Sequence, residues 1–205
     1  MQAEFAAKKK REKLKMQCNT DKNAIRALMK EKRKSQSKYE RESKSRAICT
    51  AFTALEAFKV ANSVCVYMSA FGEADTEQII EECIKHKKDI AVPVVDGEDI
   101  YLCKYTDELV SGAFGIHEPL EKIRVDVRDI DLFAVPALAF DKKGGRVGFG
   151  KGYYDKLLSG AEGIKVGLLY EFQLAEDLPA EKHDILMDFL ITEKQIIKCK
   201  LNERL

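Results

Sequence analysis

Several features that would assign a chain to a common class are missing from this sequence. Its longest purely apolar stretch, residues 132–140, contains a proline and is far too short to span a bilayer. Residues 1–11 have no apolar core of the kind that a secretory signal peptide requires. The two glutamates and the absence of serine in residues 1–20 argue against a mitochondrial transit peptide. We therefore expect a soluble protein of the cytoplasm, without a membrane partner.

Cysteine and histidine do not occur in the arrangements that build reactive sites. The six cysteines form no C-x-x-C pair and have no histidine partner at zinc spacing. The three histidines are scattered, which excludes a zinc site and a His-based catalytic triad. A cysteine nucleophile has no neighbouring histidine or helix start to activate it. Free cysteines within apolar patterns behave as small hydrophobic residues, as is usual in a reducing cytosol.

Charge is abundant, at 34% of residues, but its net value is only +1. Residues 1–46 contain 16 Lys/Arg and 6 Asp/Glu, which leaves 19 and 28 in the remainder. A basic arm beside an acidic body has two explanations, RNA binding or an arm that meets phosphates at the protein's own site. The arm lacks the interleaved aromatic residues that stack single-stranded bases, so we expect no nucleic-acid partner. We expect residues 1–20 to be a basic extension, flexible or helical, and residues 21–205 to form one domain.

Hydrophobic periodicity predicts helices that alternate with strands. Helical spacing begins at Lys22, and Ser37 with Glu40 forms a capping box for a second helix. A third helix is expected to start at a cap formed by Asp75 and Thr76, with a core face of Ile79, Ile80, Cys83 and Ile84. We expect strands at residues 64–68, 90–95, 100–105, 132–139, 165–170 and 188–191, a hairpin turn at residues 96–97 and a loop at residues 112–119. This alternation favours an α/β fold with a mainly parallel sheet.

The stretch most informative about function is residues 144–155, GGRVGFGKGYYD, in which five of twelve residues are glycine. Glycine lets consecutive backbone N–H groups turn toward one anion, and Arg146 and Lys151 add positive charge. Asp155 closes the run and is placed to hold a metal ion beside phosphates. A helical pattern follows at residues 153–158, so the loop opens onto a helix N-terminus, which favours phosphate. The run predicts a nucleotide site beyond the carboxyl ends of the strands.

We compared this run with two familiar nucleotide-binding motifs and with an alternative that has no function. Residues 145–151 fit G-x-x-x-x-G-K, but Gly152 stands where a P-loop requires Ser or Thr for magnesium. The spacing of Gly148, Gly150 and Gly152 is also wrong for the dinucleotide-binding fingerprint. The alternative is a flexible surface loop, although loops rarely combine this much glycine with Arg, Lys and a terminal Tyr-Tyr-Asp.

Four polar residues outside the run are further candidates for the site. Glu73 lies too early to cap the third helix and is therefore expected to contact a ligand. Lys22 and Arg26 are one helical turn apart, so both side chains can face one target, with simple solvation as the alternative. Asp184 lies in a loop just before the last strand and is a candidate for a second metal carboxylate.

Taken in order, these motifs resemble the 5-formyltetrahydrofolate cyclo-ligase family, also called methenyltetrahydrofolate synthetase. The resemblance covers roughly residues 21–195 and is most specific in RVGFGKGYYD at residues 146–155. It implies a three-layer, Rossmann-like fold of the NagB/RpiA/CoA-transferase-like type, with a mainly parallel sheet flanked by helices. The weaker matches are the helix with Lys22 and Arg26, YMSAFGEADT at residues 67–76, Pro93, GIHEP at residues 115–119 and VPALAFD at residues 135–141.

The resemblance also implies roles for individual residues. Arg146, Lys151 and Tyr153 are the expected catalytic residues, and Asp155 and Asp184 are expected to hold Mg²⁺. The expected folate contacts are Glu73, the residue before it, and Phe149, Gly150, Lys151, Gly152 and Tyr153. The expected ATP contacts are Lys22, Arg26, Arg146, Val147, Gly148, Phe149, Gly150, Lys151, Gly152, Tyr153 and Tyr154.

The activity that the resemblance implies suits this residue set. Family enzymes transfer the ATP γ-phosphate to the formyl oxygen of 5-formyltetrahydrofolate, and the iminium phosphate then closes to the 5,10-methenyl ring. Phosphoryl transfer needs alignment and charge neutralisation more than a covalent nucleophile, so the missing triad is expected. The implied protein is a monomeric cytoplasmic enzyme of one-carbon metabolism, with ATP and 5-formyltetrahydrofolate as substrates and Mg²⁺ as cofactor.

Overall fold

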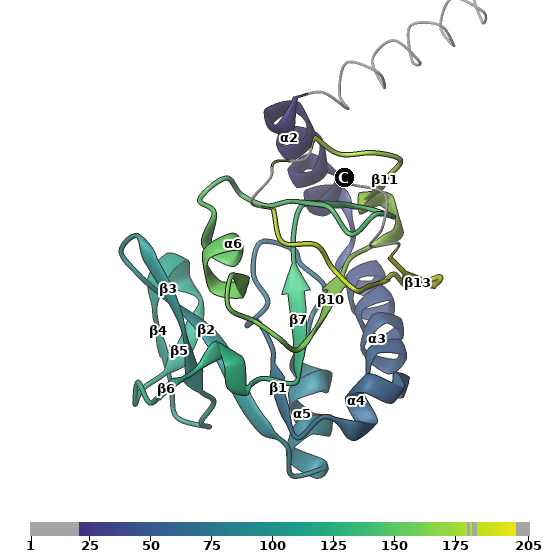
Figure 1. The fold of residues 1–205 in the computed structure, drawn as a ribbon. Helices are drawn as coiled ribbons and strands as arrows, with labels where there is room; N and C mark the ends of the chain where they lie inside the picture. Colours follow the sequence, from purple (N-terminus) through teal and green to yellow (C-terminus); the bar gives the residue numbers. More distant parts are fainter. Residues whose placement is uncertain (1–20, 180, 182–183, 200–205) are drawn as a thin grey trace, which may run out of the picture.

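The computed structural model describes residues 21–179, 181 and 184–199, so the expected basic extension lies outside the described residues. An eight-stranded sheet forms the centre (Figure 1). The five inner strands are parallel and the outer pairs are antiparallel, which confirms the predicted α/β fold with a mainly parallel sheet. In spatial order the strands are β13 (Ile196–Lys198), β12 (Phe189–Ile191), β10 (Ile164–Leu168), β7 (Leu132–Pro136), β1 (Ser63–Cys65), β2 (Asp89–Asp96), β3 (Asp99–Lys104) and β6 (Arg124–Val125).

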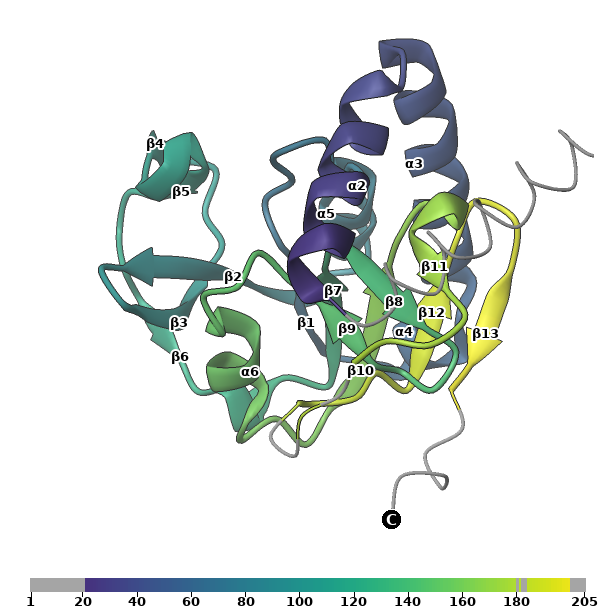
Figure 2. The same ribbon diagram turned by 90° about the horizontal axis from the view of Figure 1, so that it is seen from above.

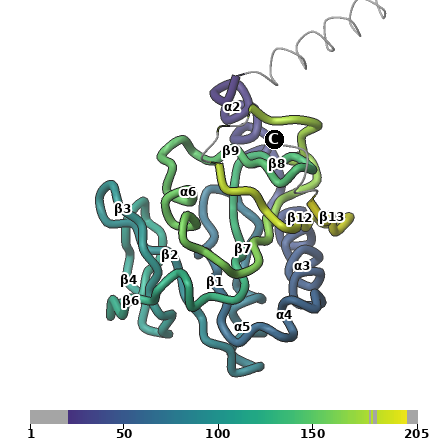
Figure 3. The backbone as a smooth tube through the Cα atoms, in the orientation of Figure 1, coloured from purple at the N-terminus to yellow at the C-terminus, as the bar shows by residue number. Residues whose placement is uncertain are grey.

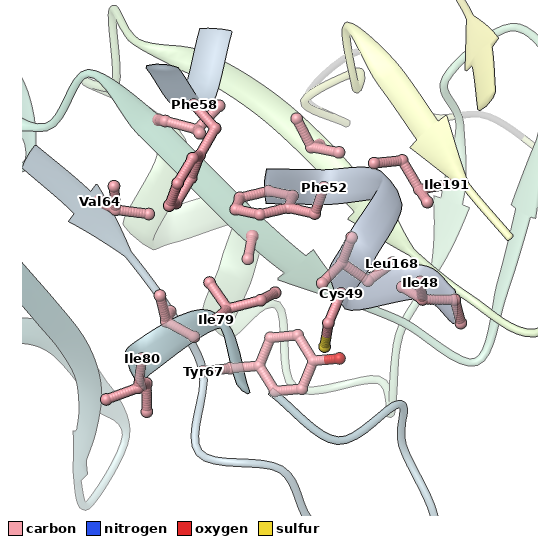
Figure 4. Close-up of a cluster of buried hydrophobic side chains, with 14 of the residues drawn as sticks. Ile48, Cys49, Phe52, Phe58, Val64, Tyr67, Ile79, Ile80, Leu168 and Ile191 are labelled. Carbon is pink, nitrogen blue, oxygen red and sulfur yellow. The ribbon is translucent and has the colours of Figure 1, made fainter. Parts of the chain in front are cut away.

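Helices cover both faces of the sheet and make three layers. α3 (Lys38–Ala54) and α5 (Glu77–Lys85) lie on one face, and α6 (Tyr153–Leu158) lies on the other (Figure 2). Figure 4 shows the first of these interfaces, where α3, α5 and the short helix α4 (Glu56–Val60) pack against the sheet. Along β7, Leu132 and Ala134 join this cluster, whereas Phe133 and Val135 face the layer of α6. Burial on both faces explains the continuous apolar sequence of β7.

The first two described helices begin as predicted. Asp21 caps α2 (Lys22–Ser35) by accepting the N–H of Asn23 at 2.8 Å. Ser37 and Glu40 form the predicted capping box of α3, because Ser37 Oγ accepts the N–H of Glu40 at 3.2 Å and Glu40 Oε2 accepts the N–H of Ser37 at 2.9 Å. Reciprocal bonds of this kind satisfy N–H groups that a helix start otherwise leaves unpaired.

The start and the core face of α5 differ from the prediction. Thr76 does not cap the helix through its side chain, since its hydroxyl donates to the carbonyl oxygen of Tyr67 at 2.6 Å. Asp75 takes this role alone, and its Oδ1 accepts the N–H of Glu77 at 2.9 Å. Ile84 is 52% exposed, so the buried stripe is narrower than the one predicted. Thr76 therefore anchors the chain after β1 rather than the first turn of α5.

The strand predicted at residues 132–139 is in fact two strands in different sheets. β7 ends at Pro136, where proline offers no N–H to continue the ladder. The chain resumes as β8 (Ala139–Asp141), which pairs with β9 (Arg146–Val147) and β11 (Leu174–Ala175) in a second sheet. This small sheet packs against the apolar stripe of α2 and delivers the glycine run beneath that helix (Figure 3).

The loop predicted at residues 112–119 contains regular structure. β4 (Leu109–Ser111) and β5 (His117–Pro119) form a two-stranded hairpin, closed by the short helical turn η1 (Ala113–Gly115). The edge strands β6 and β13 were also missed. Strands of two or three residues are too short to display a period of two, so sequence patterns do not reveal them.

The strand order creates a crevice at one edge of the sheet. β2 lies on one side of β1, whereas β7 lies on the other, so the connections leaving β1 and β7 diverge. Ligands of open parallel sheets bind beyond the carboxyl ends of strands at such a switch point. In Figure 1, α2 lies across this edge, above the tip of β7.

Candidate active site

A cavity of about 920 Å³ lies beyond the carboxyl ends of β1 and β7. It is bordered by α2, the loop after β1, the end of β7, the β2–β3 hairpin, the β4–β5 hairpin and the glycine run. Eight lysines and arginines but only four acidic residues line it, an excess of positive charge that suits a polyanionic ligand. The structure brings together here all the residues that the sequence singled out, namely Lys22, Arg26, Glu73, Arg146, Val147, Gly148, Phe149, Gly150, Lys151, Gly152, Tyr153, Tyr154, Asp155 and Asp184.

The glycine run passes around the side chain of Arg26. Arg26 Nε donates to the carbonyl oxygen of Gly148 at 3.0 Å, and Nη1 donates to Asn23 Oδ1 at 2.7 Å. Gly150 has a φ of +101°, and a Cβ there would lie 3.3 Å from Arg26 Cζ. Both the backbone conformation and the close approach therefore require glycine. Gly152, with a φ of +69°, occupies the N-cap of α6, the helix predicted after the run.

Lys22 connects the start of α2 to the segment that carries Asp184. Its Nζ lies 2.6 Å from Glu181 Oε1 and 3.8 Å from Asp184 Oδ2. Asp184 Oδ2 also accepts the N–H of Glu181 at 2.7 Å. One of the predicted phosphate-binding cations and one of the predicted metal ligands therefore lie side by side. Lys151, by contrast, is exposed on the cavity wall.

Arg146 and Asp155 form a close ion pair in the cavity. Arg146 Nη2 donates to Asp155 Oδ1 at 2.6 Å, and the Arg146 side chain is only 5% exposed. Burial lowers the pKa of Arg146, an effect that Asp155, Tyr154 and Asp184 oppose. The N–H of Ile185 faces the same Oδ1 at 3.5 Å. Asp155 and Asp184 therefore both favour the charged form of Arg146.

The residues present fit a magnesium ion that is shared with a nucleotide. Within the described part of the chain, no group of three or more His, Cys, Asp or Glu could hold a metal ion alone. Mg²⁺ is commonly held by one or two carboxylates together with waters and substrate phosphates. Asp155 and Asp184 beside a basic wall match that arrangement, whereas an all-protein metal cage does not fit.

A second wall of the cavity is apolar and was largely missed in the sequence. Phe114, at the tip of the β4–β5 hairpin, is 61% exposed and has a φ of +58°. Tyr153 donates its hydroxyl hydrogen to the carbonyl oxygen of Gly97 at 3.0 Å, which ties α6 to the β2–β3 turn. Apolar side chains with a few placed polar groups are typical of sites for flat heterocycles. The wall consists of Pro93, Val95, Ile100, Phe114, Ile116, Tyr153 and Tyr154.

In the loop after β1, Glu73 forms a buried ion pair with Arg33 of α2. Arg33 Nη1 lies 3.7 Å from Glu73 Oε1, and the two side chains are only 2% and 9% exposed. Burial raises the pKa of Glu73 to about 7, although Arg33 and the N–H of Ala70 favour the charged form. Burial also lowers the pKa of Arg33, which Glu73 partly offsets. A carboxyl group that titrates near neutral pH inside a cavity is typical of functional sites.

An aromatic pair joins the loop after β1 to the glycine run. The ring centroids of Phe71 and Phe149 are 5.6 Å apart, and Lys30 Nζ lies 5.3 Å from the centroid of Phe149. Both rings are about half exposed, and both border the cavity. Their free faces are available for stacking with a planar ligand.

Arg33 is the most important cavity residue that the sequence reasoning missed. The buried residues of α2 are Ile25, Met29 and Arg33, which are spaced four apart on one face. A charged residue on the buried stripe of an amphipathic helix is unusual, because burying an unpaired charge is costly. This interruption of the stripe is the signal that could have identified Arg33.

The cysteines have the packing environment that the sequence predicts. The five described cysteines are buried and free, and burial raises the pKa of each thiol, in agreement with a packing role. The cysteine residues buried in this way are Cys49, Cys65, Cys83, Cys103 and Cys199.

Among the residues that the structure describes, no helix combines the length and apolarity required to cross a membrane.

Comparisons with known proteins agree with the geometry of the cavity. The family model of the 5-formyltetrahydrofolate cyclo-ligase family matches residues 18–193. The 5-formyltetrahydrofolate cyclo-ligase of Escherichia coli K12 is 34% identical over 67% of this chain and 81% of its own length. The solved 5,10-methenyltetrahydrofolate synthetase of Aquifex aeolicus is 39% identical, with a TM-score of 0.80 over 90% of this chain and 95% of that one. The corresponding structure from Mycoplasma pneumoniae is 25% identical, with a TM-score of 0.72 over 85% and 99%. The predicted resemblance is thereby confirmed, and the chain belongs to the 5-formyltetrahydrofolate cyclo-ligase family of enzymes.

Proposed function

We propose that this protein converts 5-formyltetrahydrofolate to 5,10-methenyltetrahydrofolate with ATP and Mg²⁺, releasing ADP and phosphate. The observation that carries this proposal is that a basic wall and an apolar wall line the same cavity. Lys22, Arg26, Arg146 and the glycine run form a basic wall suited to phosphates. The apolar wall with Phe114 is suited to a pterin ring. A phosphorylated heterocycle needs both surfaces within reach of one another.

The proposed reaction begins with attack of the formyl oxygen on the γ-phosphorus of ATP. ADP leaves, and an iminium phosphate of the folate remains. The N10 nitrogen then attacks the formyl carbon, loses its proton, and phosphate departs as the five-membered ring closes. Each step develops or moves negative charge on oxygen, so fixed cations and aligned substrates supply the catalysis.

The residues of the basic wall have different roles in this reaction. Lys22 and Arg26 bind the phosphates of ATP, and the backbone from Arg146 to Tyr154 encloses them. Arg146 stabilises the charge that develops during transfer, held in place by its 2.6 Å contact with Asp155. Lys151 adds a second cation to the same charge from its exposed position on the wall. When bound, Mg²⁺ would be held by Asp155 and Asp184 and would neutralise charge on the phosphates.

The folate binds against the second wall and the loop after β1. Glu73 contacts the pterin, and Tyr153 orients it, since its hydroxyl is already fixed by Gly97. Phe149 contacts both substrates, because it lies in the glycine run of the basic wall and its half-exposed ring borders the cavity. We propose that the enzyme acts as a cytoplasmic monomer on these small molecules, without a nucleic-acid or membrane partner.

The test is direct. Purified protein is mixed with ATP, Mg²⁺ and 5-formyltetrahydrofolate, and the methenyl product is followed by its absorbance in the near ultraviolet. We expect one ADP for each methenyl group formed, and no product without ATP. Folded protein that yields neither product would refute the proposed reaction. Light scattering coupled to gel filtration measures the mass of the active species.

A further inference from the structure

Unsatisfied hydrogen-bond donors are concentrated in the cavity. Among the described residues, five buried side-chain nitrogens have no hydrogen-bond partner, and all of them belong to residues that line the cavity. A buried donor without a partner destabilises the folded protein, so such groups usually mark a place that a ligand or water completes. Two of the five nitrogens belong to one residue, Arg33. The five are Arg33 Nε, Arg33 Nη1, Gln36 Nε2, Arg41 Nε and Arg146 Nε.

The guanidinium of Arg33 is held in place and yet incompletely bonded. Its Nη2 donates to the carbonyl oxygen of Ala137, which directly follows β7. Its Nη1 lies 3.7 Å from Glu73 Oε1, which is too long for a hydrogen bond. Glu73 Oε2 accepts the N–H of Ala70 at 3.1 Å, which leaves Oε1 without a close donor. The lining of the cavity therefore contains buried N–H donors without a hydrogen-bond partner, beside a carboxylate oxygen whose ion-pair partner, Arg33 Nη1, is 3.7 Å away.

This pattern does not suit a phosphate. Arg33 lies seven residues beyond Arg26 on α2, a rise of about 10 Å from the glycine run. The charge of Arg33 is opposed by Glu73, and a phosphate placed there would meet that carboxylate. The ligand that fits is a neutral group that carries a donor and an acceptor on adjacent atoms. A lactam edge has this arrangement, with an N–H next to a C=O.

We propose that Arg33 is a further substrate-binding residue, which together with Glu73 recognises the lactam edge of the pterin ring. The free N–H groups of Arg33 donate to the 4-oxo oxygen, and Glu73 Oε1 accepts the N3–H. This inference rests on the proposed function for its choice of ligand. It names a residue outside the glycine run and the chemical feature of the folate that the residue selects.

The test compares folic acid with aminopterin, which differ only in the substituent at pterin C4. Aminopterin carries an amino group there, so it lacks both the 4-oxo acceptor and the N3–H donor. By calorimetry, we expect the wild-type protein to bind folic acid at least tenfold more tightly than aminopterin. In Arg33→Met this preference should shrink to about twofold or less, while the Kd for ATP changes by less than about threefold. Lys32→Met is the matched control, because it removes the same charge from α2 outside the cavity.

Fold integrity is checked separately, since Arg33 is buried. The double variant Arg33→Met/Glu73→Gln leaves no charge unpaired, so it should fold even where the single variant does not, and it should also lose the preference. Arg33→Lys keeps the charge but not the planar fork, and we expect an intermediate preference. Each variant is compared with the wild type by thermal unfolding.

Three outcomes would overturn the inference. They are equal binding of folic acid and aminopterin by the wild type, an undiminished preference in the folded variants, and a loss of ATP affinity instead of folate affinity. The proposed function fails separately, by absence of turnover in the wild type. A protein that discriminates between the two pterins through Arg33 without forming methenyl product would refute the reaction and support the inference.

Discussion

The two walls of the cavity differ in how the sequence encodes them. The basic wall comes from one helix and one continuous run, in which function is concentrated in glycines, cations and an aspartate. The apolar wall comes from the β2–β3 hairpin, the β4–β5 hairpin and α6, and it uses ordinary apolar residues. Positive φ values and charges inside a glycine run have few structural explanations, whereas an isolated Ile or Phe has many. Site residues can therefore be predicted from a sequence where their type or spacing is unusual. They cannot be predicted where they are ordinary apolar residues that differ from core residues only in being exposed to the cavity.

The largest effect is expected from the basic wall, at Asp155. Asp155→Asn removes the negative charge beside Arg146 and one proposed ligand of Mg²⁺ while keeping the size of the side chain. We expect kcat to fall roughly 10³-fold, the scale of losing a charge-stabilising group in an active site. Turnover is measured across a range of Mg²⁺ concentrations, and folding by thermal unfolding.

Asp177→Asn is the control for that change, because Asp177 pairs with Lys143 on the surface and does not border the cavity. It should retain wild-type turnover and Mg²⁺ dependence. Equal kcat and equal Mg²⁺ dependence in Asp155→Asn and the wild type would remove Asp155 from the site.

Glu73 lies on the loop after β1 and borders the cavity, and we predict that it affects stability. Its pKa is about 7 in the folded protein against an ordinary value of 4.5, so the folded state binds more protons between these pH values. The stabilisation is complete below about pH 4.5 and is lost as pH rises through 7, by about 3 kcal/mol in total. Arg33, Tyr67 and Tyr154 face the same carboxyl group. Glu73→Gln should abolish this part of the pH dependence, measured by urea unfolding between pH 5 and pH 8.

The comparison variant is Glu81→Gln, on the exposed side of α5. It should keep the wild-type decrease in the free energy of unfolding with pH. A Glu73→Gln protein with that same decrease would mean that another group causes it. The absolute stability of Glu73→Gln carries less information, because the change also leaves Arg33 buried without its partner.

The fold was more predictable than the exact limits of its elements. The capping box at Ser37 and the both-face burial of β7 are local signals, and both are confirmed. The break after Pro136 was missed because residues 132–140 are apolar throughout, so no change of period marks the turn. The misassignment of Thr76 has a similar cause. The sequence suggests that the Thr76 hydroxyl bonds the first turn of α5. It bonds the carbonyl oxygen of Tyr67 instead, which only the tertiary structure brings within reach.

The site residues that could be predicted are those with a distinctive pattern in the local sequence. All the residues named from the sequence border one cavity, including Asp184, which is 29 residues away from Asp155 in the chain. Arg33 and the apolar wall were missed because their role depends on neighbours from distant segments. Arg33 meets Glu73 only after α2 crosses the carboxyl ends of the strands.

The backbone of the basic wall depends on Gly150. Gly150→Ala places a methyl group against the Arg26 guanidinium, at a φ of +101° that alanine rarely adopts. We expect kcat/KM for ATP to fall by up to about 10²-fold, because a displaced phosphate-binding residue misaligns the transfer. Gly160→Ala, where φ is not positive and the nearest atom is a Val127 methyl at 3.4 Å, should keep wild-type kinetics. A fully active Gly150→Ala enzyme would show that the position of Arg26 does not matter for turnover.

The smallest effect is expected at the apolar wall, and it decides whether the two walls serve different substrates. Phe114→Ala removes a ring that is 61% exposed, so stability should hardly change. We expect KM for 5-formyltetrahydrofolate to rise about fivefold with KM for ATP unchanged, since a stacked ring contributes on the order of 1 kcal/mol. Leu120→Ala removes another exposed apolar side chain, just after the same hairpin and outside the cavity, and should affect neither constant. If Phe114→Ala raises KM for ATP instead, the apolar wall binds the nucleotide base, and the assignment of the walls to the two substrates must be reversed.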